Sequence, residues 1–276
     1  MKLSVALATY NEEENIARCL NSISGWADEI VIVDGKSNDK TVDIAKKYNA
    51  RIILKENEEN FHKNKQIAIE NCKGEWILQL DADEEVTNNL KDEILKVVSH
   101  PERPKGVEGS RVEPVSGYWI PRKNYFLGKF LKKGGQYPDY TLRLYRRGKG
   151  KLPALNVHEQ AEVAGKTEYL KNPLLHYNYP DLKHYFDHFK RYTDIFANEI
   201  IDENYKEKSR HPERPKGVEG SRFLSYMLIK PFTWFISTYI RHKGFMDGYQ
   251  GFLFSFFSSL RFPVSYIKAL KINYKK

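Results

Sequence analysis

Cysteine is scarce in this chain, which has only Cys19 and Cys72 among its 276 residues. Two thiols cannot form the disulfide framework of a small secreted domain, so we expect a reducing compartment. A signal-peptide pattern is also missing, because residues 1–5 lead directly into a strand pattern without a basic region and a long apolar stretch. These absences favour a cytoplasmic protein over an exported one.

Long uninterrupted apolar runs are missing as well. The segments 223–240 and 251–262 are apolar and aromatic, but Lys230, Pro231 and Arg261 interrupt them, and neither matches a transmembrane helix of about 20 apolar residues. Basic residues accompany both segments: Lys230, Arg241, Lys243, Arg261, Lys268 and Lys271. This combination predicts helices that lie in the interface of an anionic membrane, on its inner face. A buried helical subdomain or a dimer interface would explain the same pattern.

Acidic and basic residues are divided unevenly along the chain, although the net charge is +9. Residues 1–100 contain 13 Lys and Arg against 19 Asp and Glu, whereas residues 101–276 contain 32 against 17. This division predicts a metal-using site in the acidic part and a C-terminal part that faces anions, such as substrate phosphates, lipid headgroups or nucleic acid. A solvated basic surface would produce the same pattern.

Strand and helix patterns alternate over the first hundred residues. Apolar runs predict four strands, at 3–8, 29–33, 51–54 and 75–80. Helices are predicted between them, the first with Asn11 as N-cap and Glu14 closing a capping box. Such alternation predicts parallel βαβ units and an α/β fold that binds its substrate at the carboxyl ends of the strands. Shorter strands at 117–120 and 140–145 and a helix over 181–207 follow.

A twelve-residue segment, HPERPKGVEGSR, occurs twice without change, at 100–111 and at 211–222. Its proline, glycine and charge indicate surface loops, and we interpret both copies as inserted linker-like sequence, with a duplicated binding loop as the alternative. The predicted organisation is therefore a catalytic domain over 1–210, the linker-like segment at 211–222, and a membrane-associated helical region over 223–276.

Two carboxylates follow the fourth predicted strand, in the run Asp81-Ala82-Asp83. Side chains two residues apart on a strand point to the same side, and paired carboxylates suit Mg²⁺ or Mn²⁺. Such an ion can bridge the phosphates of a nucleoside diphosphate. The neighbouring Glu84 and Glu85 add negative charge that also suits a cation site. A solvated acidic loop is the alternative for so short a motif.

Several motifs occur in a diagnostic order: residues 9–13 (TYNEE), residues 33–41 (VDGKSNDKT) and residues 74–84 (GEWILQLDADE). Together they resemble the successive signatures of family 2 glycosyltransferases. The later segments 137–144 (YPDYTLRL) and 157–159 (VHE) are similar to those of bacterial enzymes that build lipopolysaccharide cores, including core β-glucosyltransferases.

The resemblance implies a GT-A fold, a Rossmann-like, mostly parallel sheet flanked by helices, and a nucleotide-sugar donor, with UDP-sugars favoured. It implies inversion at the anomeric carbon and a need for Mn²⁺ or Mg²⁺. It also assigns residues to the donor nucleotide: Thr9, Tyr10, Glu12, Asp34, Lys65 and Asp81. The metal would be bound by Asp83, with Asp81 facing both the ribose and the metal.

An inverting transfer needs a general base that takes the proton of the acceptor hydroxyl. Asp139 is the first candidate and Glu159 the second. Arg143, on the same side of a strand as Asp139, would keep that carboxylate ionised or bind the departing diphosphate, although a surface ion pair is the alternative. His158 is a candidate metal ligand or diphosphate donor, or a structural histidine.

Two other functions remain open on the residues alone. A nucleotidyltransferase would also place acidic residues at strand ends, but it would be expected to carry a glycine-rich, basic phosphate loop, whereas residues 11–14 are acidic. A nucleic-acid-binding protein would use the basic residues near Arg143, but no recognised nucleic-acid motif accompanies them. We therefore expect a sugar donor and a glycan or lipid-linked acceptor as partners, and no nucleic acid.

Overall fold

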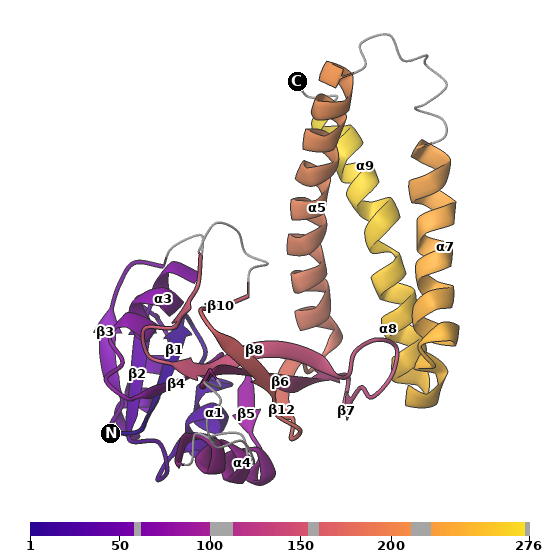
Figure 1. The fold of residues 1–276 in the computed structure, drawn as a ribbon. Coiled ribbons are helices and arrows are strands. Elements are labelled where there is room, and N and C mark those ends of the chain that lie inside the picture. Colours follow the sequence, from indigo (N-terminus) through magenta and orange to yellow (C-terminus); the bar gives the residue numbers. More distant parts are fainter. Residues whose placement is uncertain (58–61, 100–112, 154–159, 211–221, 274–276) are drawn as a thin grey trace. The chain divides into compact units, whose positions relative to one another are not determined.

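The computed structural model describes residues 1–57, 62–99, 113–153, 160–210 and 222–273, with side chains except those of 203–210 and 273 (Figure 1). The chain divides into two compact units. Unit 1 contains Met1–Lys123 and Pro138–Tyr177, and unit 2 contains Asn124–Tyr137 and Asn178–Lys276. The two copies of the twelve-residue segment lie outside the described residues, except for Arg222.

Unit 1 begins with the predicted alternation of strands and helices. Its elements are β1 (Leu3–Thr9), α1 (Ile16–Ile23), β2 (Glu29–Asp34), α2 (Thr41–Lys46), β3 (Arg51–Leu54), α3 (His62–Glu70) and β4 (Trp76–Leu80). Strands β3, β2, β1 and β4 are parallel neighbours in that order. The register places Thr9 beside Asp34, so the ends of β1 and β2 meet at one edge of the sheet.

The sheet continues beyond β4 with strands that pair mostly antiparallel, although β11 is parallel to β6. The later elements are β5 (Glu84–Val86), α4 (Asn88–Ser99), β6 (Val115–Phe126), β8 (Asp139–Arg146), β9 (Gly150–Lys151), β10 (Glu162–Val163), β11 (Lys166–Tyr169) and β12 (Leu174–Tyr179). The strand order is β3-β2-β1-β4-β8-β6-β12-β5. The predicted α/β fold is therefore confirmed.

The core of unit 1 lies on both faces of the sheet, because alternate residues of β1 point to opposite sides. Leu3, Val5 and Leu7 pack with α1 and α4. Ala6 packs on the other face with Ala68 of α3. Covering both faces is the usual arrangement for parallel strands, and it leaves the strand ends as the place for polar side chains.

The predicted start of the first helix is wrong. Helix α1 begins at Ile16 with Asn15 before it, and Asn11 has a positive φ of 55°. The backbone N–H groups of residues 11–13 instead donate to side chains of the loop after β2 and of the first residue of α2: Ser37, Asp39 and Thr41. These bonds hold residues 11–15 as a turn next to that loop, so the helix starts later.

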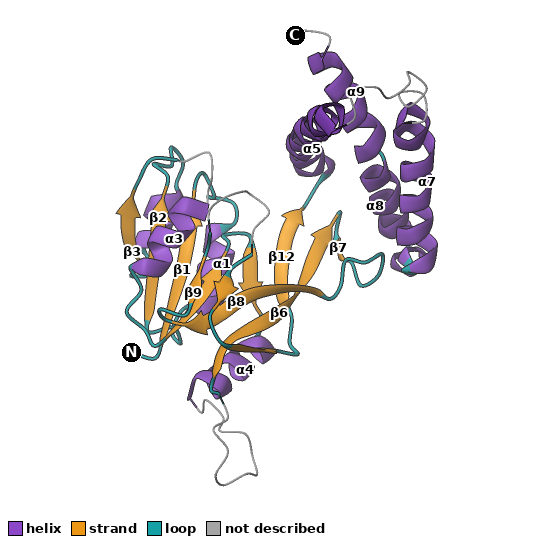
Figure 2. Cartoon of the chain, turned by 45° about the horizontal axis from the view of Figure 1, so that its top comes forward, coloured by secondary structure: helices purple, strands orange, loops and turns teal. Residues whose placement is uncertain are grey.

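Unit 2 is mostly helical, as Figure 2 shows for α5, α7, α8 and α9, which lie side by side. Its elements are β7 (Lys129–Phe130), α5 (Leu182–Arg210), η1 (Ser225–Ile229), α7 (Lys230–Phe235), η2 (Ile236–Arg241), η3 (Gly244–Asp247), α8 (Tyr249–Ser259) and α9 (Arg261–Asn273). The predicted helix over 181–207 and the predicted C-terminal helices are present. No helix within the described residues combines the length and the apolar character needed to cross a membrane.

The boundary between the units differs from the prediction, which ended the catalytic domain at residue 210. Helix α5 packs through Ala197 and Ile201 against Tyr266 and Ala269 of α9, so it belongs with the C-terminal helices. Residues 124–137 also join unit 2, where the carboxylate of Asp247 accepts hydrogen bonds from the backbone N–H groups of residues 132 and 133, at 2.9 and 2.7 Å.

Candidate functional site

The ends of β1 and β2 carry a buried polar cluster around Asp34. Thr9 Oγ1 donates to Asp34 Oδ2 at 2.8 Å, and Ser37 donates through its backbone N–H to Oδ1 at 2.8 Å and through Oγ to Oδ2 at 2.7 Å. A carboxylate offers about four acceptor positions, and these bonds occupy three of them. Asp34 is fully buried, and its hydrogen bonds with Ser37 hold the loop after β2 in place. Tyr10, next to Thr9, is 42% exposed.

Glu12 lies in the turn after β1 and is electrostatically coupled to the acidic residues after β4. Burial raises the pKa of Glu12 to about 7, opposed by a hydrogen bond from Asn15, and the negative charges of Asp83 and Asp81 raise it further. The fold therefore brings three carboxyl groups from two strand ends into one electrostatic neighbourhood. Such a concentration of negative charge is what a bound cation would relieve.

Asp81 is held by two cations. Arg143 Nη2 lies 2.6 Å from Asp81 Oδ2, and Lys65 of α3 forms an ion pair with Oδ1. Burial alone would raise the pKa of Asp81, but Arg143 and Lys65 lower it well below its ordinary value. The sequence-predicted residues Lys65, Asp81 and Arg143 are thus brought together.

Asp83 is paired with a residue that the sequence analysis did not select. Its Oδ2 lies 3.2 Å from Nε2 of His176 on β12. Burial would raise the pKa of Asp83, but the charge and hydrogen bond of His176 lower it. Antiparallel pairing of β12 with β5 places His176 opposite Glu84 and so brings the imidazole to Asp83.

The donor set around Asp83 suits a divalent cation. Carboxylate oxygen and imidazole nitrogen are both ligands that Mn²⁺ accepts, and Mg²⁺ is commonly bound by one or two carboxylates together with substrate phosphates. Among the described residues, no group of three or more His, Cys, Asp and Glu side chains is arranged to hold a metal. Asp83 and His176 would thus leave most coordination positions to phosphate oxygens and water.

Glu84 does not serve a cation site in the way its sequence position suggested. It is fully buried, its Oε1 accepts a hydrogen bond from Arg143 Nη2 at 2.7 Å, and its Oε2 accepts the backbone N–H of Asp81 at 2.9 Å. Arg122 Nη1 lies 3.5 Å from the same Oε1. Glu84 therefore holds Arg122 of β6 and Arg143 of β8 next to the Asp81–Asp83 turn.

Asp139 is paired with Arg122, which corrects the predicted partnership with Arg143. Arg122 Nε and Nη2 donate to Asp139 Oδ2 at 3.0 and 2.8 Å, because the antiparallel register of β6 and β8 places the two residues opposite each other. The side chain of Asp139 is 33% exposed. Its carboxylate is thus oriented by a guanidinium and partly accessible to solvent.

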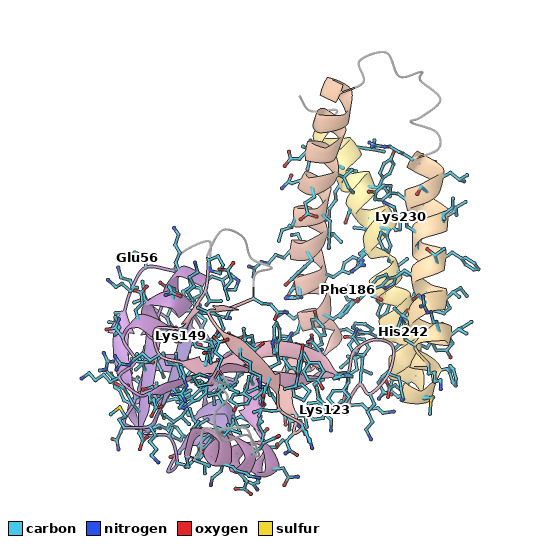
Figure 3. The ribbon with its side chains drawn as sticks, viewed as in Figure 1. Glu56, Lys123, Lys149, Phe186, Lys230 and His242 are labelled. Carbon is cyan, nitrogen blue, oxygen red and sulfur yellow. The ribbon has the colours of Figure 1, made fainter. Side chains whose placement is uncertain are left out.

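His158 and Glu159 lie outside the described residues, so their predicted roles stay predictions. Arg122 and His176 are the two site residues that the sequence analysis missed. Their strand positions, in IPRKN and LLHYN, carried no local motif. Only the pairing of strands distant in sequence selects them. Figure 3 draws the side chains of both units.

Comparison with known proteins gives a family match over more than half of the chain. The model described as Glycosyl transferase family 2 matches residues 4–152. An uncharacterised glycosyltransferase of Rickettsia typhi is 42% identical over 93 residues, and the chain covers only 32% of that relative's length. The lipopolysaccharide core biosynthesis glycosyltransferase LpsC of Rhizobium meliloti is 24% identical over 259 residues, which span 92% of this chain and 86% of LpsC.

A solved structure agrees with the fold. The mannosyltransferase PcManGT from Pyrobaculum calidifontis, in complex with GDP-Man and Mn²⁺, is similar over 98% of this chain and 87% of its own, with a TM-score of 0.51 and 13% identity. At that identity the likeness concerns the fold alone. The predicted GT-A architecture is confirmed.

Proposed function

The chain belongs to glycosyl transferase family 2, and from this premise we propose that it transfers a sugar from a nucleoside-diphosphate sugar, UDP-sugars favoured, to a glycan or lipid-linked acceptor of the lipopolysaccharide type. The observation that carries the proposal is the meeting of Thr9, Glu12, Asp81 and Asp83 at the carboxyl edge of the parallel strands. This is where α/β sheets bind their ligands. The family match favours glycosyl transfer over nucleotidyl transfer and nucleic-acid binding.

The donor would bind at the edge formed by β1, β2 and β4. The exposed ring of Tyr10 offers a stacking face for the base, and the loop that Asp34 holds would line the base pocket. Lys65 and Arg143, which hold Asp81, place two positive charges near the position proposed for the diphosphate. Positive charge there stabilises the leaving group.

The divalent cation would be held by Asp83 with His176, next to Asp81. When bound, Mn²⁺ or Mg²⁺ supplies neutralisation of the charge that develops on the leaving diphosphate. The protein's own part is to hold the Asp81 carboxylate in place, which the hydrogen bond from Arg143 does. His158 would be a further ligand of the cation.

Inversion would follow from a single displacement at the anomeric carbon. The acceptor oxygen forms the new glycosidic bond as the bond to the diphosphate breaks, and the electron pair leaves with the diphosphate. Asp139 would take the acceptor proton, with its carboxylate oriented by Arg122. Glu159 is the second candidate for this base.

The acceptor would be reached at a membrane surface, on the inner face of the cell membrane. Support comes from the large apolar side chains that unit 2 exposes to solvent, among them Leu228 at 61%, Phe232 at 66%, Met246 at 57% and Tyr249 at 65%. Exposed apolar side chains of this number are typical of a surface that meets a membrane or another protein. Basic residues of the same helices would meet anionic headgroups.

Calorimetric titration with UDP, GDP and CMP, each with and without Mn²⁺, tests the donor site. We expect Mn²⁺-dependent UDP binding by the wild-type protein and its loss in Asp83→Asn. His176→Gln should weaken the binding about tenfold through the metal. Asp92→Asn, on the exposed side of α4, is the matched control and should bind as the wild type does. Metal-dependent binding of GDP alone would change the donor, and absence of any metal-dependent binding would refute the enzyme proposal.

A further inference from the structure

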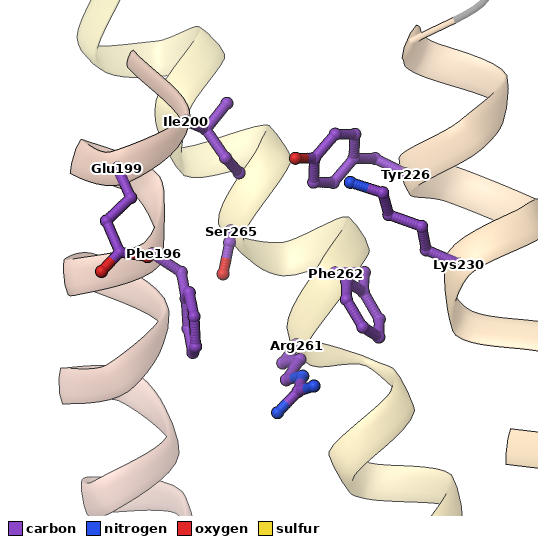
Figure 4. A pocket seen from close by; sticks show the side chains of 8 residues that line it. All are labelled: Phe196, Glu199, Ile200, Tyr226, Lys230, Arg261, Phe262 and Ser265. Carbon is purple, nitrogen blue, oxygen red and sulfur yellow. The ribbon is translucent and has the colours of Figure 1, made fainter. Parts of the chain in front are cut away.

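Unit 2 contains a pocket between three of its helices, with a volume of about 220 Å³. Its lining comes from α5, from the continuous helix formed by η1 and α7, and from α9, as Figure 4 shows. For scale, an apolar cavity of about 150 Å³ in another protein accommodates benzene. The pocket therefore has room for a small headgroup or for a short stretch of chain, but not for a nucleotide sugar.

Two cations line this pocket, and no acidic side chain that the structure describes pairs with either of them. The Arg261 guanidinium lies 3.9 Å from the centre of the Trp234 ring and 4.8 Å from that of Phe262, and Lys230 Nζ lies 3.4 Å from the centre of the Tyr226 ring. Within the part of the chain that the structure describes, neither cation forms an ion pair. The aromatic rings hold both cations in place while leaving their N–H donors available.

The partial burial of Arg261 also favours an anionic ligand. Desolvation lowers the pKa of Arg261, only partly offset by Tyr185. An arginine nonetheless stays protonated at neutral pH, so this half-buried positive charge has no counter-charge among the residues that the structure describes. Glu199 is the one acidic residue among the pocket-lining residues, and it is exposed to solvent.

A buried hydroxyl points to the same kind of ligand. Ser265 lines the pocket and is 2% exposed, and none of the described residues forms a hydrogen bond with its Oγ. Buried polar groups are nearly always hydrogen-bonded, so an orphaned hydroxyl on a pocket wall indicates a partner that arrives with the ligand. The rest of the wall is apolar and includes Phe196, Ile200 and Phe262. The pocket thus combines donors for an anion with apolar surface.

The helix that supplies Tyr226 and Lys230 indicates where the ligand comes from. Residues four apart lie on one face of a helix. Tyr226 and Lys230 line the pocket on one side, and Leu224, Leu228 and Phe232 are 49%, 61% and 66% exposed on another. Figure 3 labels Lys230 on this helix. A helix with an exposed apolar side next to an anion pocket matches a lipid bilayer rather than a soluble anion.

We propose that this pocket binds the phosphate group of a membrane lipid, with Arg261, Lys230 and Ser265 as donors and the aromatic wall against the adjoining chain. The proposal rests on the part of the proposed function that places unit 2 at a membrane, and not on the donor chemistry of unit 1. The site would anchor the helices at a phosphate-bearing lipid, which is also the chemical class of a lipid-linked acceptor.

Titration calorimetry with hexyl phosphate, hexanol and inorganic phosphate tests the pocket. We expect hexyl phosphate to bind, and hexanol and inorganic phosphate to bind at least about tenfold more weakly. Hexanol lacks the phosphate group, and inorganic phosphate lacks the apolar chain. Arg261→Gln and Lys230→Gln should each weaken hexyl phosphate binding about tenfold. Arg241→Gln, an exposed arginine of η2, is the control and should leave it unchanged.

Ser265→Ala provides a second variant in case loss of the Arg261 ring contacts unfolds unit 2, and it should weaken binding several-fold while the melting curve stays that of the wild type. Vesicles of phosphatidylcholine with and without phosphatidic acid test whether the pocket binds the phosphate of a lipid rather than a soluble phosphate. Lys230→Gln should reduce binding to the vesicles that contain phosphatidic acid more than Arg241→Gln does. Equal binding of inorganic and hexyl phosphate, or equal effects of Lys230→Gln and Arg241→Gln on hexyl phosphate binding, would overturn the lipid site. UDP binding by the same variants should be unchanged, so failure of the donor site and of this site are distinguishable.

Discussion

Arg143 connects two acidic residues of the candidate site, and replacing it by Met tests whether that connection holds the site together. Its Nη2 contacts Asp81 and Glu84 at 2.6 and 2.7 Å, and Glu84 is fully buried. Removing one partner from a buried ion pair costs about 3–5 kcal/mol, because the other charge stays buried. Asp81 retains Lys65 and Glu84 retains Arg122, so we expect the lower end, about 3 kcal/mol.

Urea unfolding followed by tryptophan fluorescence measures this loss. Trp234 is the one tryptophan of unit 2, so a Trp234→Phe background leaves Trp26, Trp76 and Trp119 to report on unit 1. With a urea slope of about 2 kcal/mol per molar, the midpoint should fall by about 1.5 M. Arg147→Met, at an exposed position on the same stretch, is the control and should change stability by no more than about 0.5 kcal/mol.

Two further results follow from the same contacts. Adding Glu84→Gln to Arg143→Met should recover a large part of the loss, because a neutral amide needs no cation. The pKa of Asp81 is lowered in the folded protein, so its ion pairs stabilise above the unfolded pKa of about 3.9 and that stability is lost as the pH falls toward the folded value. The difference between wild type and Arg143→Met should therefore shrink below about pH 4. A loss under about 1 kcal/mol at pH 7, or no recovery in the double variant, would refute this role of Arg143.

Three other predictions concern unit 1. The pKa of Glu12 is raised to about 7, so its ionisation opposes folding at alkaline pH. Glu12→Gln should therefore stabilise the metal-free protein by about 1–3 kcal/mol at pH 8 and hardly at pH 4, where Glu12 is mostly protonated in both the folded and the unfolded state. Equal urea midpoints of the wild type and the variant at pH 8 would contradict this. Gly74→Ala should lower the melting temperature and cost about 2 kcal/mol or more, since an added Cβ would lie 2.6 Å from the backbone N of Ser4; an unchanged melting temperature would argue against this packing. Cys19 and Cys72 are buried, and burial raises the pKa of both thiols. Neither thiol should therefore react with Ellman's reagent until the protein unfolds. Rapid reaction of the native protein would count against that burial.

The order of strands and helices in unit 1 could be predicted from the sequence because the signal is local. The nearly continuous apolar run of β1, which includes Val5, Ala6 and Leu7, specifies a strand with two buried faces. The acidic pair after β4 follows from where the apolar run ends. Short connections between such elements leave few topologies other than parallel βαβ units, so the edge that carries Thr9, Asp34 and Asp81 was predictable as well.

The first turn of α1 shows where local signals fail. Asn11 and Glu14 form a capping pattern, but the N–H groups of residues 11–13 bond to Ser37, Asp39 and Thr41 instead. These side chains come from the loop after β2 and from the first residue of α2. A cap supplied by a distant loop has no trace in the neighbouring sequence.

By itself, then, the sequence determined the family, the α/β fold, and the strand end at which Asp81 and Asp83 stand, because each depends on residues that are near one another in the chain. The tertiary structure alone decided which cation faces which carboxylate. The antiparallel register of β6 and β8 pairs Asp139 with Arg122, and the pairing of β12 with β5 brings His176 next to Asp83. Ion pairs of this kind are set by strand register between distant segments, and a shift of one residue would turn each side chain to the other face of the sheet.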